Sequence, residues 1–477
     1  MRAPRLVPIV LVAAIGCATN PATGRRQLIL MSEQDEIQLG RQADAEVRQQ
    51  MGVYGNAELQ RYVERVGMTL VRSSYRGELP WTFAVVNEPA VNAFALPGGF
   101  VYVTRGLLPF LRDESELAAV MAHEIGHVDG RHGADAYSRQ LLAGGGLAIG
   151  GVFLPEIRPF EGLANAALGL LFLRHSREAE LEADQIGIRY ASAQGWDPSG
   201  MPGLLATLAR LDEASGSSRG VPNWALTHPP AADRVTRVQE AVAASRSPSA
   251  TATNRAAFER FLDGLVFGDS REKGIVRGAE FLHPILRLAL RFPAGWDIAN
   301  ADDQVTAVEN DTGTIGIVLR IVENPSESVE RTAQATMTKA GFREVSGQRT
   351  RINGLDAYVG TYSALIETRQ LAARAAHVQL GGQTYLLAGL APANELARVE
   401  PAFSLTINSF RELSQSEADR IQPDRVDFHV VRGGETWESL ATSAGGRLRA
   451  STLAIMNGYE PTLRPRAGDR IRIVVGG

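Results

Sequence analysis

The sequence predicts a multidomain α+β protein, and three observations indicate that class. The chain has 477 residues, a length that suits about three domains. Apolar residues at three- and four-residue steps around 114–128 predict helices in the first half, whereas alternating stretches beyond residue 288 predict strands. A run of small and polar residues at 241–254 is typical of a linker between these halves.

The N-terminal segment predicts export. Residues 1–16 have two arginines, an apolar run too short to span a membrane comfortably and a final Ala-Ile-Gly, and we expect them to be a lipoprotein signal peptide. Cys17 is the only cysteine, so no intramolecular disulfide can form and lipidation is its expected use. An ordinary signal peptide before an incidental cysteine is the alternative. We expect a lipid-anchored protein of the bacterial periplasm, and Ala18 indicates outer-membrane sorting by resemblance to bacterial lipoproteins.

The stretch AVMAHEIGHVDGRHG carries the first candidate site. With 8 histidines and 53 acidic residues in the chain, His-acid-x-x-His is expected by chance in roughly 0.015 places. On a helix, His123 and His127 lie one turn apart on the same side, so both imidazoles can bind one zinc ion. Glu124 can then act as general base, as in the H-E-x-x-H helix of metalloproteases. The alternative is a helix with solvated histidines. Asp113 or Ser115 is expected to cap this helix.

The stretch LRHSREAELEADQIGIRY, at 173–190, is expected to supply a third ligand. One polar face of the predicted helix, which we interpret as solvated, carries Glu178, Glu182, Gln185 and Arg189. Glu180 and Asp184 form a second pair on a more apolar side, where carboxylates need a partner such as a metal. We therefore expect Glu180 to bind the metal and Asp184 to hydrogen bond a ligand histidine or orient the site.

HEIGH followed about fifty residues later by SREAELEAD resembles the M48 metallopeptidases, in particular their periplasmic BepA/LoiP group. The resemblance covers roughly residues 20–240 and includes NAFALPGGFVYVTRGLL at 92–108 and THPPAADR at 227–234. It implies a mainly helical zincin-type (gluzincin) protease domain, expected at 17–245. It also implies that one Zn²⁺ is bound by His123, His127 and Glu180.

Two further motifs are expected near the site. FVYVTRG, at 100–106, predicts a strand with LPGG as its turn, and resemblance to zinc peptidases implies that this strand borders the cleft and pairs with an extended substrate. His228 precedes two prolines and so lies on a rigid loop. It is expected to stabilise the oxyanion or to occupy the open zinc position at rest; a loop histidine bonded to backbone is the alternative. Arg234 is expected to pair with a carboxylate near the site.

Two classes of function follow. The first is a zinc-dependent endopeptidase of the bacterial envelope, with Glu124 as general base, His228 and Asp184 as further catalytic residues, and misfolded or unfolded envelope proteins or peptides as substrates. The second is a lipoprotein chaperone or scaffold for outer-membrane assembly, whose zinc site is structural or silenced by His228. The presence of Glu124 favours the enzyme. The net charge of −4 gives no nucleic-acid signature.

The region after the linker, expected at 246–258, is predicted to be an α+β sandwich at 259–420 that resembles the PsbP/Mog1 type through FPAGW. Its expected strands are 305–308, 315–322, 356–362, 373–380 and 383–389, and its expected helices are 326–340 and 392–412. Gly381 and Gly382 are expected to form the turn of a hairpin. We find no catalytic constellation in this region, so binding or scaffolding is its expected role.

The last segment, 428–475, resembles a LysM module with the order βααβ. Its seven arginines against four acidic residues suit an anionic cell-wall polymer such as peptidoglycan, although a generic solvated surface explains them as well. The apolar, glycine-rich segment 141–172 is expected to form packed helices over the cleft, with lipid contact as the alternative.

Overall fold

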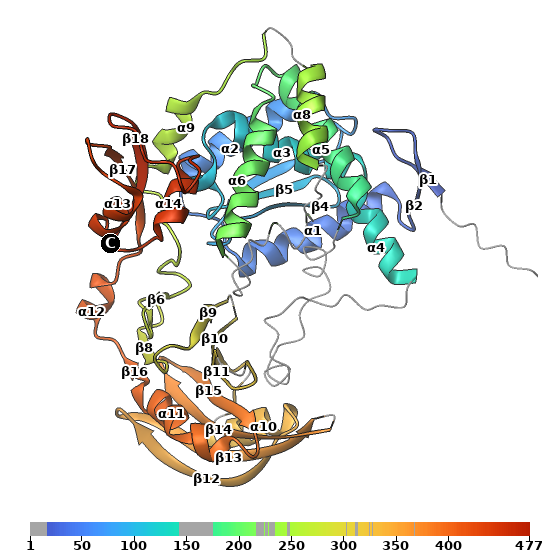
Figure 1. The fold of residues 1–477 in the computed structure, drawn as a ribbon. Helices are drawn as coiled ribbons and strands as arrows, with labels where there is room; N and C mark the ends of the chain where they lie inside the picture. The colour runs from blue at the N-terminus through green and yellow to red at the C-terminus, as the bar shows by residue number, and fades with distance from the viewer. Residues whose placement is uncertain are drawn as a thin grey trace, which may run out of the picture.

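The computed structural model describes residues 17–142, 175–215, 224, 228, 234–245, 249–301, 303–310, 313–323, 325–326, 328–366 and 368–477. The expected signal peptide and nearly all of the apolar segment 141–172 lie outside the described residues. Figure 1 shows two bodies, with the C-terminal module against the first of them.

The first body is built on a three-stranded sheet with helices on both faces (Figure 1). Its central strand, β5 (Phe100–Thr104), is parallel to β3 (Thr82–Val86) and antiparallel to β4 (Ala93–Leu96). α1 (Glu33–Gln50) packs on one face, and α2 (Ala57–Val71) packs on the other together with the helix that carries HEIGH. The alternating apolar residues of the strands supply both cores.

The central position of β5 contradicts the expectation that residues 100–106 pair with substrate, because β3 and β4 already occupy both edges of this strand. β4 is an edge strand of this sheet instead. The predicted LPGG turn is confirmed, since Leu96 pairs with Phe100. Gly98 and Gly99 have φ angles of 86° and 100°, which only glycine adopts readily.

The helix that carries HEIGH, α3 (Glu114–Asp129), is buried along its whole length. Asp113 is its N-cap and accepts hydrogen bonds from the backbone N–H groups of Ser115 and Glu116, at 2.9 and 3.4 Å, which decides between the two expected caps. Burial on all sides contradicts the alternative of a helix with solvated histidines.

Six further elements complete this part of the first body. They are β1 (Cys17–Thr19), β2 (Arg26–Leu28), α4 (His132–Leu142), α5 (Arg177–Ala193), α6 (Gly200–Ser215) and α8 (Arg234–Ser245). α5 lies directly against α3, and small residues allow the two helices to approach closely. A Cβ on Gly126 would lie 3.0 Å from the carbonyl oxygen of Ala183, and one on Gly187 would lie 3.0 Å from the backbone nitrogen of His123.

The segment 246–258, which was expected to be a linker, is partly folded against the first body. Residues from Arg255 onward form α9 (Arg255–Leu262), whose Phe258 and Leu262 are fully buried in the core of the first body. Ala252 also forms a β-bridge with Trp196. The small residues of this segment indicated flexibility, but their size equally allows close packing, so the first body continues beyond residue 258.

The second body is a seven-stranded antiparallel sheet in the order β12-β13-β14-β15-β11-β10-β9. Its strands are β9 (Asp297–Asn300), β10 (Gln304–Val308), β11 (Gly316–Ile321), β12 (Arg343–Ile352), β13 (Leu355–Ile366), β14 (Arg369–Leu380) and β15 (Gln383–Pro392). α10 (Val329–Lys339) covers one face and α11 (Leu396–Ser409) the other. A smaller sheet, in the order β16-β8-β7-β6, comprises β6 (Ile275–Arg277), β7 (Glu280–His283), β8 (Leu288–Arg291) and β16 (Arg411–Glu412).

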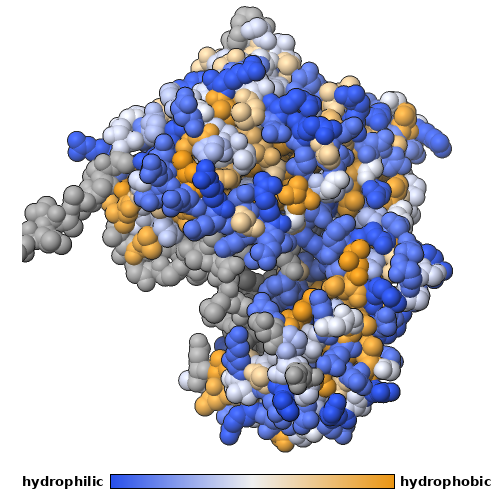
Figure 2. Space-filling model, turned by 180° about the vertical axis from the view of Figure 1, so that it is seen from behind, coloured by the Kyte–Doolittle hydropathy of each residue, from blue (hydrophilic) through white to orange (hydrophobic). Residues whose placement is uncertain are grey.

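The predicted α+β class and the five predicted strands are confirmed, as is the Gly381-Gly382 hairpin. β12 was not predicted, because it is an exposed edge strand with no apolar alternation to detect. The face of the molecule in Figure 2 is mostly hydrophilic, with hydrophobic residues in separate patches. Among the described residues, no helix is both long enough and apolar enough to cross a membrane.

The C-terminal module has the predicted βααβ order, with β17 (Arg425–Val430), α13 (Trp437–Ser443), α14 (Ala450–Met456) and β18 (Arg470–Val475). A short helix, α12 (Gln415–Arg420), precedes it. The module is docked on the first body, where its apolar residues share a core with residues of α6 and of η1 (Leu108–Phe110).

Arg472 stabilises the contact between the C-terminal module and the first body. Its side chain is buried, and its guanidinium donates to the backbone carbonyl oxygens of Pro109 (2.8 Å), Arg112 (2.9 Å) and Met456 (3.1 Å). Two of these carbonyls belong to the segment just before α3, so Arg472 holds the module next to the start of α3. Burial lowers the pKa of Arg472 to about 10.

We predict that Arg472→Met loosens the docked module. Three carbonyl oxygens lose a charged donor, and each such hydrogen bond contributes about 1.5–3 kcal/mol, so we expect a net loss of about 3 kcal/mol after relaxation. Thermal unfolding and limited proteolysis between the first body and β17 would measure it. Arg470→Met is the matched control on the same strand, because Arg470 is exposed and pairs with Glu259. Equal stability of the two variants would contradict this role of Arg472.

A second prediction concerns His377 in β14, which is fully buried and has no hydrogen-bond partner among the described residues for either ring nitrogen. Burial lowers its pKa from 6.5 to about 3. The unfolded chain therefore gains a proton below about pH 6.5 that the folded chain does not, so stability falls by up to about 1.4 kcal/mol per pH unit between these two values. His377→Leu should remove this loss. Melting temperatures of both proteins at pH 7 and 4.5 would test it; a difference between them that does not change with pH would refute the prediction.

Candidate metal centre

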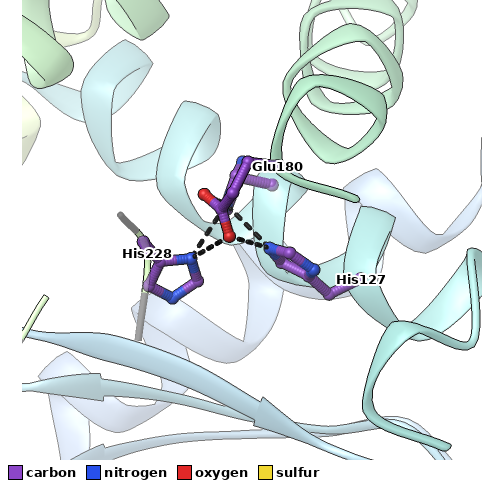
Figure 3. Close-up of side chains that lie close together, drawn as sticks. His127, Glu180 and His228 are labelled. Carbon is purple, nitrogen blue, oxygen red and sulfur yellow. Dashed lines mark hydrogen bonds and ion pairs between the residues drawn. The ribbon is translucent and has the colours of Figure 1, made fainter. Parts of the chain in front are cut away.

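Four buried side chains converge at the centre of the first body. His123 and His127 come from α3, Glu180 comes from α5, and His228 is brought in from a distant part of the chain. One ligand atom of each residue lies within 4.8 Å of the others. Figure 3 shows His127 and His228 pointing at the carboxylate of Glu180 from two sides.

The spacing of these atoms fits a zinc ion. The Nε2 atoms of His123 and His127 are 3.0 Å apart, and the Glu180 carboxylate oxygens lie 3.4 Å from Nε2 of His127 and 3.6 Å from Nε2 of His123. Four ligands at about 2.0–2.1 Å around a tetrahedral zinc are separated from one another by about 3.3 Å. The two imidazoles therefore present their nitrogens to the same point, as bound zinc requires.

The charges around this point also fit a divalent cation. Three buried carboxylates, those of Glu124, Glu180 and Asp184, face one buried guanidinium, that of Arg234. Two negative charges are left without a compensating residue among these four. Since buried charges are costly unless paired, a dication is the partner that this composition calls for.

Asp184 and Arg234 hold the ligands in place. Oδ1 of Asp184 lies 2.9 Å from Nδ1 of His123, which leaves Nε2 of that imidazole free for a metal. Arg234 donates to both oxygens of Asp184, at 2.6 and 2.9 Å, and lies 2.8 Å from Glu180. The predicted pairing of Arg234 with a carboxylate near the site is thus confirmed.

These contacts keep the carboxylates ionised in spite of their burial. Burial alone would raise the pKa of Glu180, but the histidines beside it, His228 first, hold that pKa well below its ordinary value. The pKa of Asp184 is lowered as well, because the hydrogen bonds from Arg234 and His123 outweigh the effect of burial. Glu180 is therefore ready to bind a cation, and Asp184 keeps the charge with which it orients His123.

Glu124 lies beside the ligands without belonging to them. It is buried, and its Oε1 atom accepts no hydrogen bond from the described residues, although Nε2 of His228 lies 3.6 Å away. Burial raises the pKa of Glu124, and the neighbouring histidines offset this only in part. An unsatisfied carboxylate next to a metal site can accept a proton from a molecule bound there.

His228 lies where a fourth ligand would be. Its Nδ1 atom is 3.0 Å from Oε1 of Glu180 and 3.4 Å from Nε2 of His123, the spacings expected between ligands of one zinc. Its ring stacks on Trp224, with 4.0 Å between ring centroids and 18° between planes. The backbone N–H of His228 also donates to the carbonyl of Trp224, at 2.8 Å.

Three residues near the site were not predicted. His132 contacts His127 with their Nδ1 atoms 2.9 Å apart, and His175 stacks on the ring of His127. Glu182 was assigned to the solvated face of its helix, and this is wrong, because its side chain is 10% exposed and pairs with His132. The histidine five residues after His127 was a signal in the sequence, but only the turn after α3 folds it back onto the site.

Comparison with known proteins agrees with this geometry. Residues 57–242 match the model of Peptidase family M48. The beta-barrel assembly-enhancing protease of Escherichia coli is 35% identical over 221 residues, which are 44% of this chain and 44% of that protein. The mitochondrial metalloendopeptidase OMA1 of Schizosaccharomyces pombe is 34% identical over 233 residues, 46% of this chain and 65% of that protein. The chain thus spans less than half the length of the first relative.

Solved structures are similar to a part of this chain only. The cyanobacterial PsbP of Synechocystis covers 29% of this chain and 95% of its own, with a TM-score of 0.25 and 13% identity. A likeness at this level indicates neither a shared ligand nor a shared activity.

The family match spans α3 and α5, which hold the HEIGH histidines and the Glu180 carboxylate around one point. Residues 57–242 of this chain are therefore similar to the peptidases of family M48.

Proposed function

We propose that this protein is a zinc-dependent endopeptidase that hydrolyses proteins of the bacterial envelope. The observation that carries the proposal is the buried set of His123, His127 and Glu180, beside which one carboxylate oxygen of Glu124 has no hydrogen-bond partner among the described residues. A purely structural zinc site has no need of this extra carboxylate, because such sites are closed by their ligands.

Each residue has a part in the proposed reaction. His123, His127 and Glu180 would hold a zinc ion, which would supply Lewis-acid chemistry for activating water and polarising a peptide carbonyl. Glu124 takes the proton from the attacking water and passes it to the leaving amine. Its raised pKa suits this role, because a general base works best when its pKa lies near the operating pH. Asp184 orients His123.

The proposed substrates are extended peptide segments of unfolded envelope proteins. β4 is an edge strand and packs against α3, so its free edge offers backbone groups next to the site. An added strand is bound through backbone hydrogen bonds rather than through its side chains, and this suits substrates of varied sequence. The name of the Escherichia coli relative, a beta-barrel assembly-enhancing protease, supports the envelope as the place of action.

Three parts of the proposal rest on sequence patterns. Lipidation of Cys17 would anchor the protein in the periplasm, at the outer membrane, and the C-terminal module at 428–475 would bind peptidoglycan. We also propose that the protease domain expected at 17–245 includes α9, whose residues pack in its core, and that the part of 259–420 beyond α9 is a domain for binding or scaffolding.

We predict that two substitutions separate metal binding from hydrolysis. Glu180→Ala should weaken zinc binding severely, whereas Glu124→Gln should keep stoichiometric zinc and lose at least about 10²-fold in kcat, since the general base is removed. Metal analysis and cleavage of labelled casein would measure both. Glu178→Ala, which removes the same charge from an exposed position of α5, is the control. Stoichiometric zinc in Glu180→Ala would move the third ligand elsewhere.

The position of His228 favours a resting state in which it completes the ligand set and excludes water. We therefore predict that His228→Ala raises cleavage of an unfolded substrate and self-cleavage while zinc stays bound. Oxyanion stabilisation would give the opposite sign, a fall in kcat of about 10²-fold or more. Unchanged activity would exclude both roles. If neither His228→Ala nor the wild type cleaves any unfolded protein although zinc is bound, the chaperone or scaffold function is favoured instead.

A further inference from the structure

A chain of hydrogen-bonding groups runs from His127, the second proposed zinc ligand, to the N-terminal hairpin formed by β1 and β2. Nδ1 of His127 lies 2.9 Å from Nδ1 of His132, and Nε2 of His132 lies 3.4 Å from Oε1 of Glu182. The amide of Asn20, next to β1, donates to the same carboxylate oxygen. We name these four residues, His127, His132, Glu182 and Asn20, the His132 relay.

The relay defines the proton positions on both imidazoles. If Nε2 of His127 binds a metal, its Nδ1 atom must carry the proton and donate it. Nδ1 of His132 is then the acceptor, so His132 carries its own proton on Nε2 and directs it at Glu182. Each group thus has one role that fits its neighbours, and the carboxylate of Glu182 favours this arrangement.

The backbone is built to bring His132 to this position. Arg131 has a φ of 54°, a left-handed conformation that is unfavourable for a residue other than glycine. The buried carboxylate of Glu36 accepts from Nε of Arg131 at 2.5 Å, and Arg131 also donates to the carbonyl of Met31 at 3.1 Å. Gly130 is required as well, because a Cβ there would lie 2.5 Å from Nε2 of His132.

The N-terminal hairpin packs against Gly130 and Glu182 from the outer side. Gln27 donates to the carbonyl of Gly130 at 2.8 Å, and Asn20 donates to it at 3.3 Å in addition to its contact with Glu182. The side chain of Asn20 is buried. The segment that follows Cys17 is thereby connected to Gly130, directly after the end of α3 and three residues beyond His127.

We propose that His132 is a positioning residue, which holds zinc ligand His127 in its metal-binding tautomer and orientation and is itself aligned by Glu182. The proposal rests on the zinc site described above. It assigns to His132 for His127 the role that Asp184 has for His123. Partners of this kind contribute about 10- to 100-fold to metal affinity.

The test measures metal affinity in the full-length protein. Metal-free protein is titrated with zinc in competition with a chromophoric chelator. We expect His132→Leu, which removes the acceptor, to lower zinc affinity about 10- to 100-fold. His132→Asn keeps an acceptor oxygen near the position of Nδ1, so it should restore most of that affinity. Equal affinity of His132→Leu and the wild type would overturn the proposal.

Glu182 offers a matched pair of variants on α5. Glu182→Ala should lower zinc affinity in the same direction but less than His132→Leu, because Nδ1 of His132 can still accept from His127. Glu178→Ala removes the same charge from an exposed position and should leave zinc affinity unchanged. Equal effects of the two alanine variants would reduce the role of Glu182 to general electrostatics and overturn this step of the relay.

Thermal unfolding with and without zinc distinguishes positioning from a structural role. A positioning role predicts that His132→Leu shrinks the rise in Tm on adding zinc, since that rise reports affinity. A structural role predicts a lower Tm of the metal-free protein with the rise preserved, and this result would count against the proposal. If the wild-type protein binds no zinc, the proposed function is overturned together with the relay. If the wild type binds zinc and cleaves substrate, and His132→Leu has the same zinc affinity, only the relay is overturned.

Discussion

The close contact between α3 and α5 is the constraint on which the site depends. Gly126 faces Ala183, and Gly187 faces the backbone of His123, so the two helices pack with almost no side chain between them. Only at this separation can Glu180 reach both histidines and Asp184 reach Nδ1 of His123. A larger residue at either glycine would push the carboxylates away from the imidazoles, because close-packed interiors cannot absorb even one added methyl group without movement.

This contact brings together groups that do not tolerate burial alone. Glu124, Glu180 and Asp184 are all buried, and Arg234 compensates only one of their charges. The free energy of burying the carboxylates must therefore be offset by the histidines and by a cation, so metal binding and the stability of the first body are coupled. Burial raises the pKa of Glu124, and the neighbouring histidines offset this only in part.

Both ends of α3 are held by parts of the chain that lie outside the zinc motifs. Arg472 of the C-terminal module binds carbonyls just before the helix, and Gln27 and Asn20 of the N-terminal hairpin bind the carbonyl of Gly130 just after it. A membrane anchor at Cys17 or a ligand on the C-terminal module would therefore act on segments that contact the helix directly.

The sequence alone determined what depends on local pattern. Its spacing placed His123, Glu124 and His127 on one helix, its two-residue alternation located five of the seven strands of the large sheet, and glycine pairs marked the hairpins, because each follows from the geometry of one element. Tertiary structure decided the rest. It showed β4 rather than β5 at the sheet edge, Glu182 turned inward rather than solvated, and His132 and His228 folded back onto the ligands. These features depend on which elements meet across the core, and that is set by packing between residues far apart in the chain.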